Sequence, residues 1–207
     1  MNIQIEDWYE LHKGFCLEIE PGFTALVGPN GAGKTTMLQQ IREFAKGNEI
    51  DLWEYSNIHD GGSTARERYT FYGDIKNLAA SLTASEGEGV VLNFSNKVAD
   101  LRRSIEKARE TGRPLIVLLD AIDSGASIDR ARGLRELFDF IYEHDIAKGA
   151  EVYILMAVNH YELAKSPTEC VNVRNGKHLQ FKTYDSYAKF ICSFEEKFKR
   201  KRRGKNG

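Results

Sequence analysis

The sequence contains little that would cross-link the chain or place it in a membrane. It has three cysteines in 207 residues, and their odd number and wide spacing fit neither a disulfide framework nor a zinc site, so we expect a reducing compartment. It has four prolines and no proline-rich linker, which favours a single domain. No apolar run approaches about 18 residues, and no basic-then-apolar leader opens the sequence, so we expect a cytoplasmic protein without membrane insertion. The cysteines are Cys16, Cys170 and Cys192.

The sequence also lacks a large net charge, but the charge that it has is unevenly distributed. The net charge is −1, and subtracting the seven basic residues of "KFKRKRRGKNG" leaves −8 for the rest of the chain. We therefore separate a main domain at 1–196 from a basic tail at 197–207. The basic residues 197–205 could bind nucleic-acid phosphate, bind an acidic surface of an unknown protein, or only keep the chain soluble.

Alternating strand and helix patterns indicate an α/β fold with a mainly parallel sheet. Apolar runs such as "LIVLLD" are typical of buried parallel strands, and the segments between them have helical spacing. We expect a small antiparallel N-terminal β subdomain and a truncated helical subdomain. The expected strands are 2–11, 14–20, 21–28, 49–55, 69–75, 115–120, 151–159 and a hairpin at 169–182, and the expected helices are 34–47, 90–111, 128–144 and one from about 185. The last helix has an apolar stripe at Tyr187, Phe190, Ile191, Phe194 and Phe198.

The segment "GPNGAGKT" has the spacing G-x-x-x-x-G-K-[ST] of a phosphate-binding loop. Glycines let the backbone N–H groups approach phosphate oxygens closely, and the N-terminus of the following helix adds positive potential. Lys34 would bridge the outer phosphates, and the Thr35 hydroxyl would be a ligand of Mg²⁺. ATP and Mg²⁺ are thus the expected cofactors. The residues expected to bind ATP are Gly28, Pro29, Asn30, Gly31, Ala32, Gly33, Lys34, Thr35 and Thr36.

The apolar run "PLIVLLD" ends in Asp120, an acid at the carboxyl end of a predicted buried strand. In a protein with a phosphate-binding loop, an acid at the end of a neighbouring strand holds the magnesium shell. Together with Thr35, Asp120 is therefore the expected magnesium site.

These motifs, with three further segments, resemble the ABC-type ATPases, in particular the SMC/RecF-like branch. "DSG" at 123–125 is similar to the D-loop that follows the magnesium acid in that family, and "ASEGE" at 84–88 is similar to its signature loop. The resemblance covers about residues 1–182. It implies a head-to-tail homodimer in which Ser85 and Gly87 of one copy face a nucleotide bound to the other. It further implies that His160, in "VNH", contacts the γ-phosphate and the attacking water.

The sequence departs from the family pattern at the position of the general base. The glutamate that follows the magnesium acid in the family is Ala121 here, and a methyl group cannot polarise water. Either Asp123 or His160 would then position the water. We therefore list Lys34, Asp123 and His160 as the expected catalytic residues. The family's glutamine loop is missing as well, because no glutamine lies between Gln40 and Gln180.

The functional hypothesis from the sequence is a soluble ATPase with slow turnover that serves nucleic-acid maintenance or defence. The alternative is a switch that dimerises with ATP and does not hydrolyse it. A transporter subunit is disfavoured, because only 50 residues lie between Lys34 and Ser85, too few for the helical subdomain with which transporter subunits in this family dock on a membrane partner.

Overall fold

The computed structural model describes residues 1–7, 14–57, 71 and 86–203. For residues 86–96 and 194–203 we describe the backbone alone. The strand expected at 69–75, apart from Phe71, and the candidate signature residue Ser85 lie outside the described residues.

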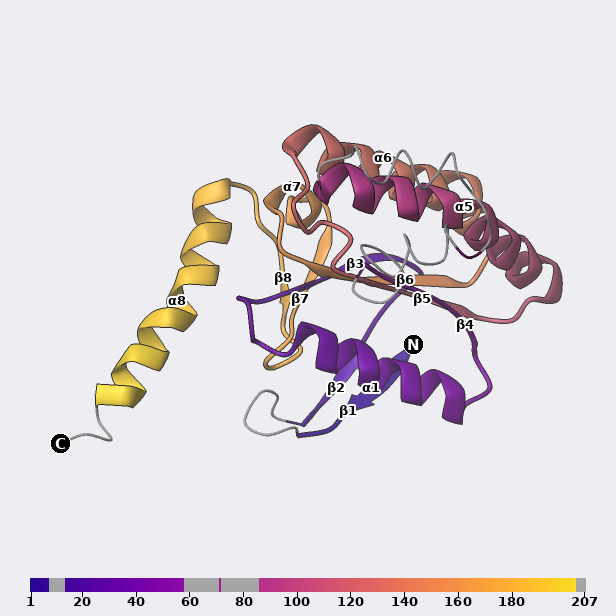
Figure 1. The fold of residues 1–207 in the computed structure, drawn as a ribbon. Coiled ribbons are helices and arrows are strands. Elements are labelled where there is room, and N and C mark those ends of the chain that lie inside the picture. Colours follow the sequence, from indigo (N-terminus) through magenta and orange to yellow (C-terminus); the bar gives the residue numbers. More distant parts are fainter. Residues whose placement is uncertain (8–13, 58–70, 72–85, 204–207) are drawn as a thin grey trace.

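A six-stranded sheet forms the centre of the molecule, in the order β4–β5–β6–β3–β7–β8 (Figure 1). Every neighbouring pair is parallel except β7 and β8, which are antiparallel. The predicted α/β class with a mainly parallel sheet is therefore confirmed. The strands are β3 (Gly22–Val27), β4 (Asp51–Ser56), β5 (Leu115–Asp120), β6 (Val152–Val158), β7 (Glu169–Asn172) and β8 (His178–Leu179).

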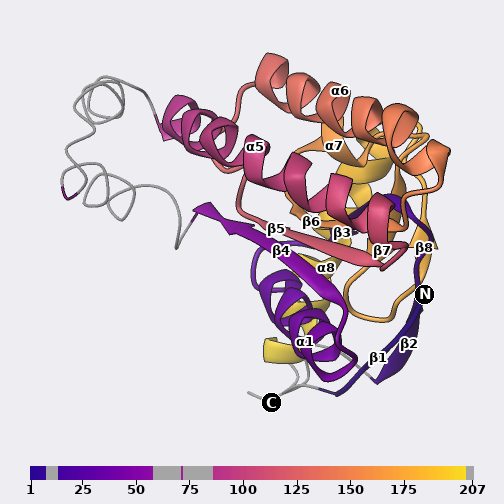
Figure 2. The same ribbon diagram turned by 90° about the vertical axis from the view of Figure 1, so that its right-hand side faces the viewer.

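Helices cover both faces of the sheet, as Figures 1 and 2 show from two directions. One face carries α1 and a separate antiparallel pair, β1 with β2, in which Ile3 lies opposite Leu17; this pair is the predicted N-terminal β subdomain. The other face carries α5, α6 and α7. The bounds are β1 (Asn2–Ile5), β2 (Phe15–Glu18), α1 (Lys34–Gly47), α5 (Glu86–Thr111), α6 (Ile128–His144), the 3₁₀ turn Ile146–Lys148, α7 (Tyr161–Ala164) and α8 (Tyr184–Arg203).

The continuous apolar run of β5 is explained by burial on both sides of the sheet. Alternate side chains of a strand point to opposite faces. Val117 and Leu119 belong to the core beneath α5 and α6, whereas Ile116 and Leu118 belong to the core beneath α1. A strand covered on one side alone would have alternated apolar with polar residues.

One helix boundary differs from the sequence prediction. α5 begins at Glu86 rather than at 90; Gly87 and Gly89 have low helix propensity, which is why the sequence pattern placed the start later. α8 begins at Tyr184, close to the expected start, and continues to Arg203, and the border at 197 between domain and basic tail stays a prediction. The predicted apolar stripe of α8 is seen at Tyr187, which is buried, and at Phe190 and Ile191, which pack against the same core.

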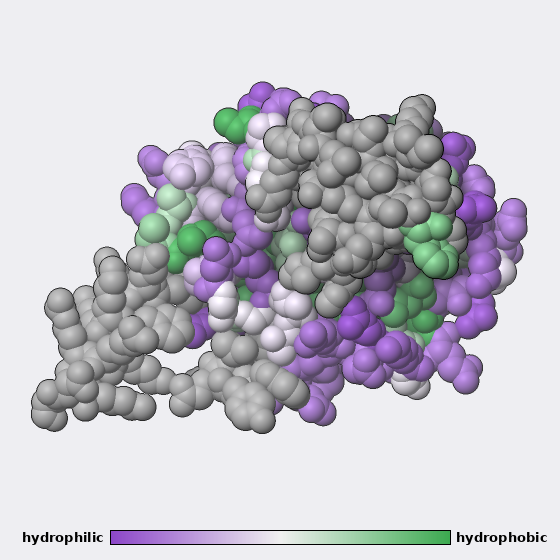
Figure 3. Space-filling view, in the orientation of Figure 1, coloured by the Kyte–Doolittle hydropathy of each residue, from purple (hydrophilic) through white to green (hydrophobic). Residues whose placement is uncertain are grey.

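The face of the molecule in Figure 3 is mostly hydrophilic where it is coloured, with apolar residues in small separate groups. The large exposed apolar side chains of the described residues come from different elements: Phe71, Ile128, Phe140, Tyr142 and Tyr184. Within the described part of the chain, no helix combines the length and apolar character needed to cross a membrane.

The turn between β7 and β8 gives a stability test, because Gly176 lies there with φ 67°. A Cβ atom on Gly176 would meet Cδ2 of Phe15 at 2.4 Å. We expect Gly176→Ala to lower the free energy of unfolding by about 2–4 kcal/mol, through the left-handed backbone and the overlap. The matched control is Gly133→Ala in α6, where the new methyl group meets nothing within 4 Å and should add about 0.5–1 kcal/mol. Urea unfolding measures both; equal effects would contradict this account of the turn.

Candidate functional site

The phosphate-binding loop connects β3 directly to α1, as the sequence predicts. Gly31 and Gly33 have φ 76° and 94°, a region that residues with a Cβ rarely adopt. At Gly28 a Cβ would lie 3.0 Å from both Ala32 and Val173. Glycine is thus required at Gly31 and Gly33 for backbone conformation and favoured at Gly28 for space.

The N-terminus of α1 is left available to an anion. Its cap, Gly33, has no side chain to accept the first N–H groups, and the first turn has no acidic residue. The residues there are Lys34, Thr35 and Thr36. Free N–H groups and the helix dipole both favour negative charge at this point.

The ammonium group of Lys34 is folded back into the loop. Nζ donates to the carbonyl oxygens of Gly28 at 2.7 Å and of Pro29 at 3.2 Å, and the residue is 9% exposed. Burial lowers the pKa of Lys34, whereas the nearby carboxylates of Asp123 and Asp120 oppose this shift. The site therefore places one positive charge among carbonyl oxygens, within the influence of two carboxylates.

A pocket of about 320 Å³ opens at this loop. Three parallel strands end at it, because β5 and β3 are both paired with β6, and β3 leads into the loop. Thr35 and Asp120, predicted from separate motifs to hold magnesium, both line it. Hydroxyl and carboxylate oxygens are the donors that Mg²⁺ prefers, so the residues present fit a magnesium ion. The lining residues are Asn30, Gly31, Gly33, Lys34, Thr35, Thr36, Asp120, Ala121, Ala157 and Asn159.

Ala121 lines the pocket directly after the magnesium acid. Its φ is 56°, so the chain turns sharply at the end of β5 in a conformation that costs a residue with a Cβ about 1–2 kcal/mol. Among the described residues that line the pocket, Asp120 alone carries a carboxylate. An adjoining pocket of about 160 Å³ shares Thr35 and Asp120 and contains Glu54, whose carboxylate is ion-paired with Arg42.

Asp123 is one of the few buried charged residues, with 4% exposure. Its Oδ2 accepts hydrogen bonds from the backbone N–H groups of Asn159 at 2.6 Å and His160 at 2.9 Å. Its Oδ1 accepts from Nδ2 of Asn159 at 3.3 Å. Both oxygens are therefore engaged in holding the segment that follows β6. The described residues that line the pocket do not include Asp123, and its expected catalytic role stays a prediction.

His160 serves as the N-cap of α7, and its Nδ1 accepts the N–H of Glu162 at 3.2 Å. This nitrogen therefore carries no proton, and in the neutral ring the proton is on Nε2. In the described part of the chain the pocket is lined by the neighbouring residue, Asn159, and not by His160.

Sequence reasoning missed Asn159 and Tyr187. Asn159 stands at the carboxyl end of β6, and its position directly after a buried strand was the available signal. Tyr187 of α8 donates its hydroxyl to the carbonyl oxygen of Asn159 at 2.9 Å, and burial raises the pKa of this tyrosine. The two residues are 28 positions apart in the sequence. Helical spacing predicts that Tyr187 is a core residue, but it cannot predict this hydrogen bond.

The Asp123 contacts yield a prediction about stability. In Asp123→Asn the new amide would point at least one N–H group toward the donors of Asn159 or His160, leaving buried groups unpaired. We expect the free energy of unfolding to fall by about 1–3 kcal/mol. Glu136→Gln, an exposed change on α6, should stay within about 0.5 kcal/mol of the unaltered protein. Indistinguishable urea midpoints for the two variants would show that the Asp123 contacts contribute nothing.

Comparison with known proteins agrees with this geometry. The model of the ATPase family associated with various cellular activities (AAA) matches residues 24–181, from within β3 to just beyond β8. No curated protein matches the chain. The family match supports a P-loop ATPase and does not extend to the ABC-type, SMC/RecF-like branch suggested by the sequence motifs. Since the match covers well over half of the chain, the chain belongs to the ATPase family associated with various cellular activities (AAA).

Proposed function

We propose that this chain binds ATP with Mg²⁺ in the pocket at the phosphate-binding loop and hydrolyses it slowly. The observation that carries the proposal is that Lys34, Thr35 and Asp120 line one pocket. Ala121, at the position where the general base is usually found, lines the same pocket with a methyl group. The first three residues supply what phosphates and magnesium need. Ala121 supplies nothing that could accept a proton from water.

Asn159, the polar residue that follows β6 in the wall of the pocket, would act on water weakly. Asn159 uses its Nδ2 on Asp123, which leaves its carbonyl oxygen as an acceptor for a water molecule in the pocket. An amide oxygen can orient a water but is a poor base. His160, whose Nδ1 is occupied by Glu162, would assist through Nε2 alone. We expect these side chains to orient the attacking water without removing its proton efficiently, and ATP hydrolysis is therefore expected to be slow.

A non-hydrolysing switch that responds to bound ATP is the second candidate function. It is favoured by the lack of a second carboxylate among the described residues that line the pocket. In this case ATP would bind, hold the site closed and be released intact. Single-turnover hydrolysis separates the two functions, because a slow enzyme converts its bound ATP in full and a switch converts none.

We further propose that two copies of the chain associate into a homodimer when ATP is bound. The segment compared with the signature loop leads into α5, which begins at Glu86 and runs for 26 residues, and a helix N-terminus attracts phosphate. Ser85 and Gly87 of one copy would then face the nucleotide of another in a homodimer. Light scattering tests this: a mass that doubles only with ATP and Mg²⁺ supports it, and a monomer under both conditions overturns it.

Nucleic-acid binding through residues 197–205, in a role in nucleic-acid maintenance or defence, is a further part of the proposal. It is supported by the basic sequence in the last turns of α8. We expect truncation after Phe198 to reduce DNA affinity by at least tenfold at low salt and to flatten its dependence on salt concentration. Fluorescence anisotropy across a salt series measures both. Equal affinities and equal slopes for the two proteins would eliminate the tail as a DNA-binding element.

Restoring a carboxylate at position 121 should test the explanation of slow turnover. We expect Ala121→Glu to raise the single-turnover rate about 10²-fold or more, the usual range for a general base. Ala121→Gln is the matched control, because it has nearly the same shape and no basic group. Quenched-flow measurement at substoichiometric ATP gives the rates. A glutamine variant as fast as the glutamate variant would contradict the missing-base account.

A further inference from the structure

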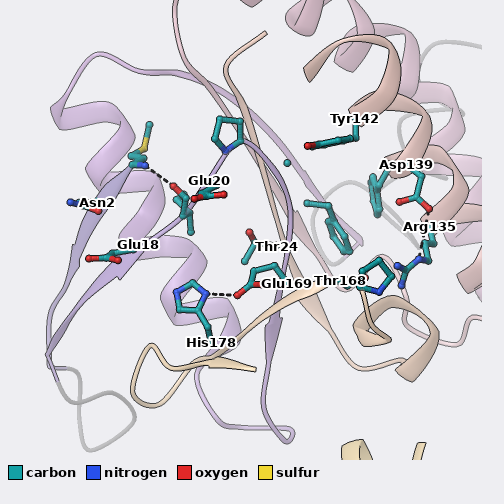
Figure 4. A pocket seen from close by; sticks show the side chains of 17 residues that line it. Asn2, Glu18, Glu20, Thr24, Arg135, Asp139, Tyr142, Thr168, Glu169 and His178 are labelled. Atoms are coloured by element: carbon teal, nitrogen blue, oxygen red, sulfur yellow. Dashed lines mark hydrogen bonds and ion pairs between the residues drawn. The ribbon is translucent and has the colours of Figure 1, made fainter. Parts of the chain in front are cut away.

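A second pocket, of about 890 Å³, lies at the opposite edge of the sheet from the phosphate-binding loop. It is lined by the first residues of β3 and β7 and by side chains of α6 (Figure 4). The carboxyl end of β3 leads into the loop, so the two pockets lie at the two ends of one strand. This volume falls within the range of sites for small organic ligands.

One wall of this second pocket is aromatic. Phe23 stacks on Phe138 with ring centroids 4.6 Å apart, and Tyr142 lies across the opening, half exposed. The ring of Tyr142 sits over Gly22, where even a Cβ would approach it to 3.5 Å. Aromatic faces of this kind attract cations as well as apolar stems.

The charge around the second pocket is negative. Its four carboxylates, Glu18, Glu20, Asp139 and Glu169, outnumber the guanidinium group of Arg135 and the amino group of Met1. The cations are already occupied: Arg135 with Asp139 and the carbonyl oxygen of Lys165, the amino group with the carbonyl oxygen of Ile19.

Glu18 and Glu20 are the two carboxylates of the pocket for which no ion pair is found among the described residues. Glu169 instead contacts Nδ1 of His178. Figure 4 shows Glu20 on one side of the space, with Arg135 and Asp139 opposite. A positive charge entering here would find a carboxylate without displacing an existing pair.

A buried side chain with an open hydroxyl points independently to a ligand. Thr24 is 4% exposed and lines the pocket, and Figure 4 shows its side chain directed into the space. No hydrogen bond of its hydroxyl is found within the described part of the chain, and the oxygen is not among the fully buried unpartnered atoms there. The hydroxyl is therefore open to the pocket, where it can accept a hydrogen bond from a ligand N–H group.

We propose that this second pocket binds a small organic cation, an ammonium or guanidinium group on an apolar stem. The charged head would be held by Glu20 and the Thr24 hydroxyl, and the stem would cross Gly22 to lie against the ring of Tyr142. Binding here would be separate from nucleotide binding, because none of these residues lines the pocket at the phosphate-binding loop.

Isothermal titration calorimetry with agmatine tests the proposal. Agmatine carries a guanidinium and an ammonium group on a four-carbon stem, and N-butylurea, of similar length but uncharged, is the control ligand. We expect saturable binding of agmatine and none of N-butylurea. Glu20→Gln should weaken agmatine binding about tenfold, as expected for a charge-assisted hydrogen bond, and Thr24→Val about fivefold. Glu110→Gln, an exposed acid on α5 away from the pocket, should leave it unchanged.

The outcomes separate this proposal from the others. Equal agmatine affinity in Glu20→Gln and Glu110→Gln would overturn it, and so would the absence of agmatine binding. Binding of a peptide with the sequence of residues 197–207 in place of agmatine would assign the pocket to a basic protein segment and overturn the small-ligand claim. ATP affinity measured on the same samples should be unchanged throughout, so failure here is distinguishable from failure of the nucleotide site.

Discussion

The burial of the Lys34 ammonium group is the constraint on which the rest of the site depends. A charge removed from water needs compensation, and here it comes from two loop carbonyl oxygens and from Asp120 and Asp123. The two carbonyl oxygens belong to the phosphate-binding loop after β3, Asp120 is the last residue of β5, and Asp123 follows three residues later. The three parallel strands must therefore end together, and the core on both faces of the sheet holds them so.

The same arrangement explains how phosphate would be received. The loop carbonyl oxygens of Gly28 and Pro29 hold the ammonium group of Lys34 in place, and no side chain caps the N-terminus of α1. Lys34 and this helix N-terminus would hold the phosphates, and Thr35 and Asp120 would hold magnesium, which would neutralise phosphate charge. Tyr187 and Asp123 support the pocket from outside its lining, because their hydrogen bonds fix the backbone of Asn159. Among the described residues that line the pocket, Asp120 is the one carboxylate, and no second acid is found there.

The sequence predicted those parts of the molecule that depend on local chemistry. The loop at 28–33 requires glycines at fixed spacing, and β5 requires a long apolar run because both its faces are buried, so both could be predicted. The contacts of Asp123 and Tyr187 join residues 36 and 28 positions apart, and no local pattern encodes such a pairing. The second pocket is likewise assembled from five strands and α6, and Thr24 there is, in sequence, only one polar residue in a buried strand.

The central claim is that Lys34, Thr35 and Asp120 form one ATP–magnesium site, and ATP binding with and without Mg²⁺ tests it most directly. We predict that Lys34→Ala weakens ATP binding at least about 10²-fold in either condition, as loss of a buried charge contact should. Asp120→Asn should instead remove most of the gain in affinity that Mg²⁺ gives. The same experiment on Lys46→Ala, an exposed lysine of α1, should show no change. Unchanged ATP affinity in Lys34→Ala, with the protein folded, would contradict the account.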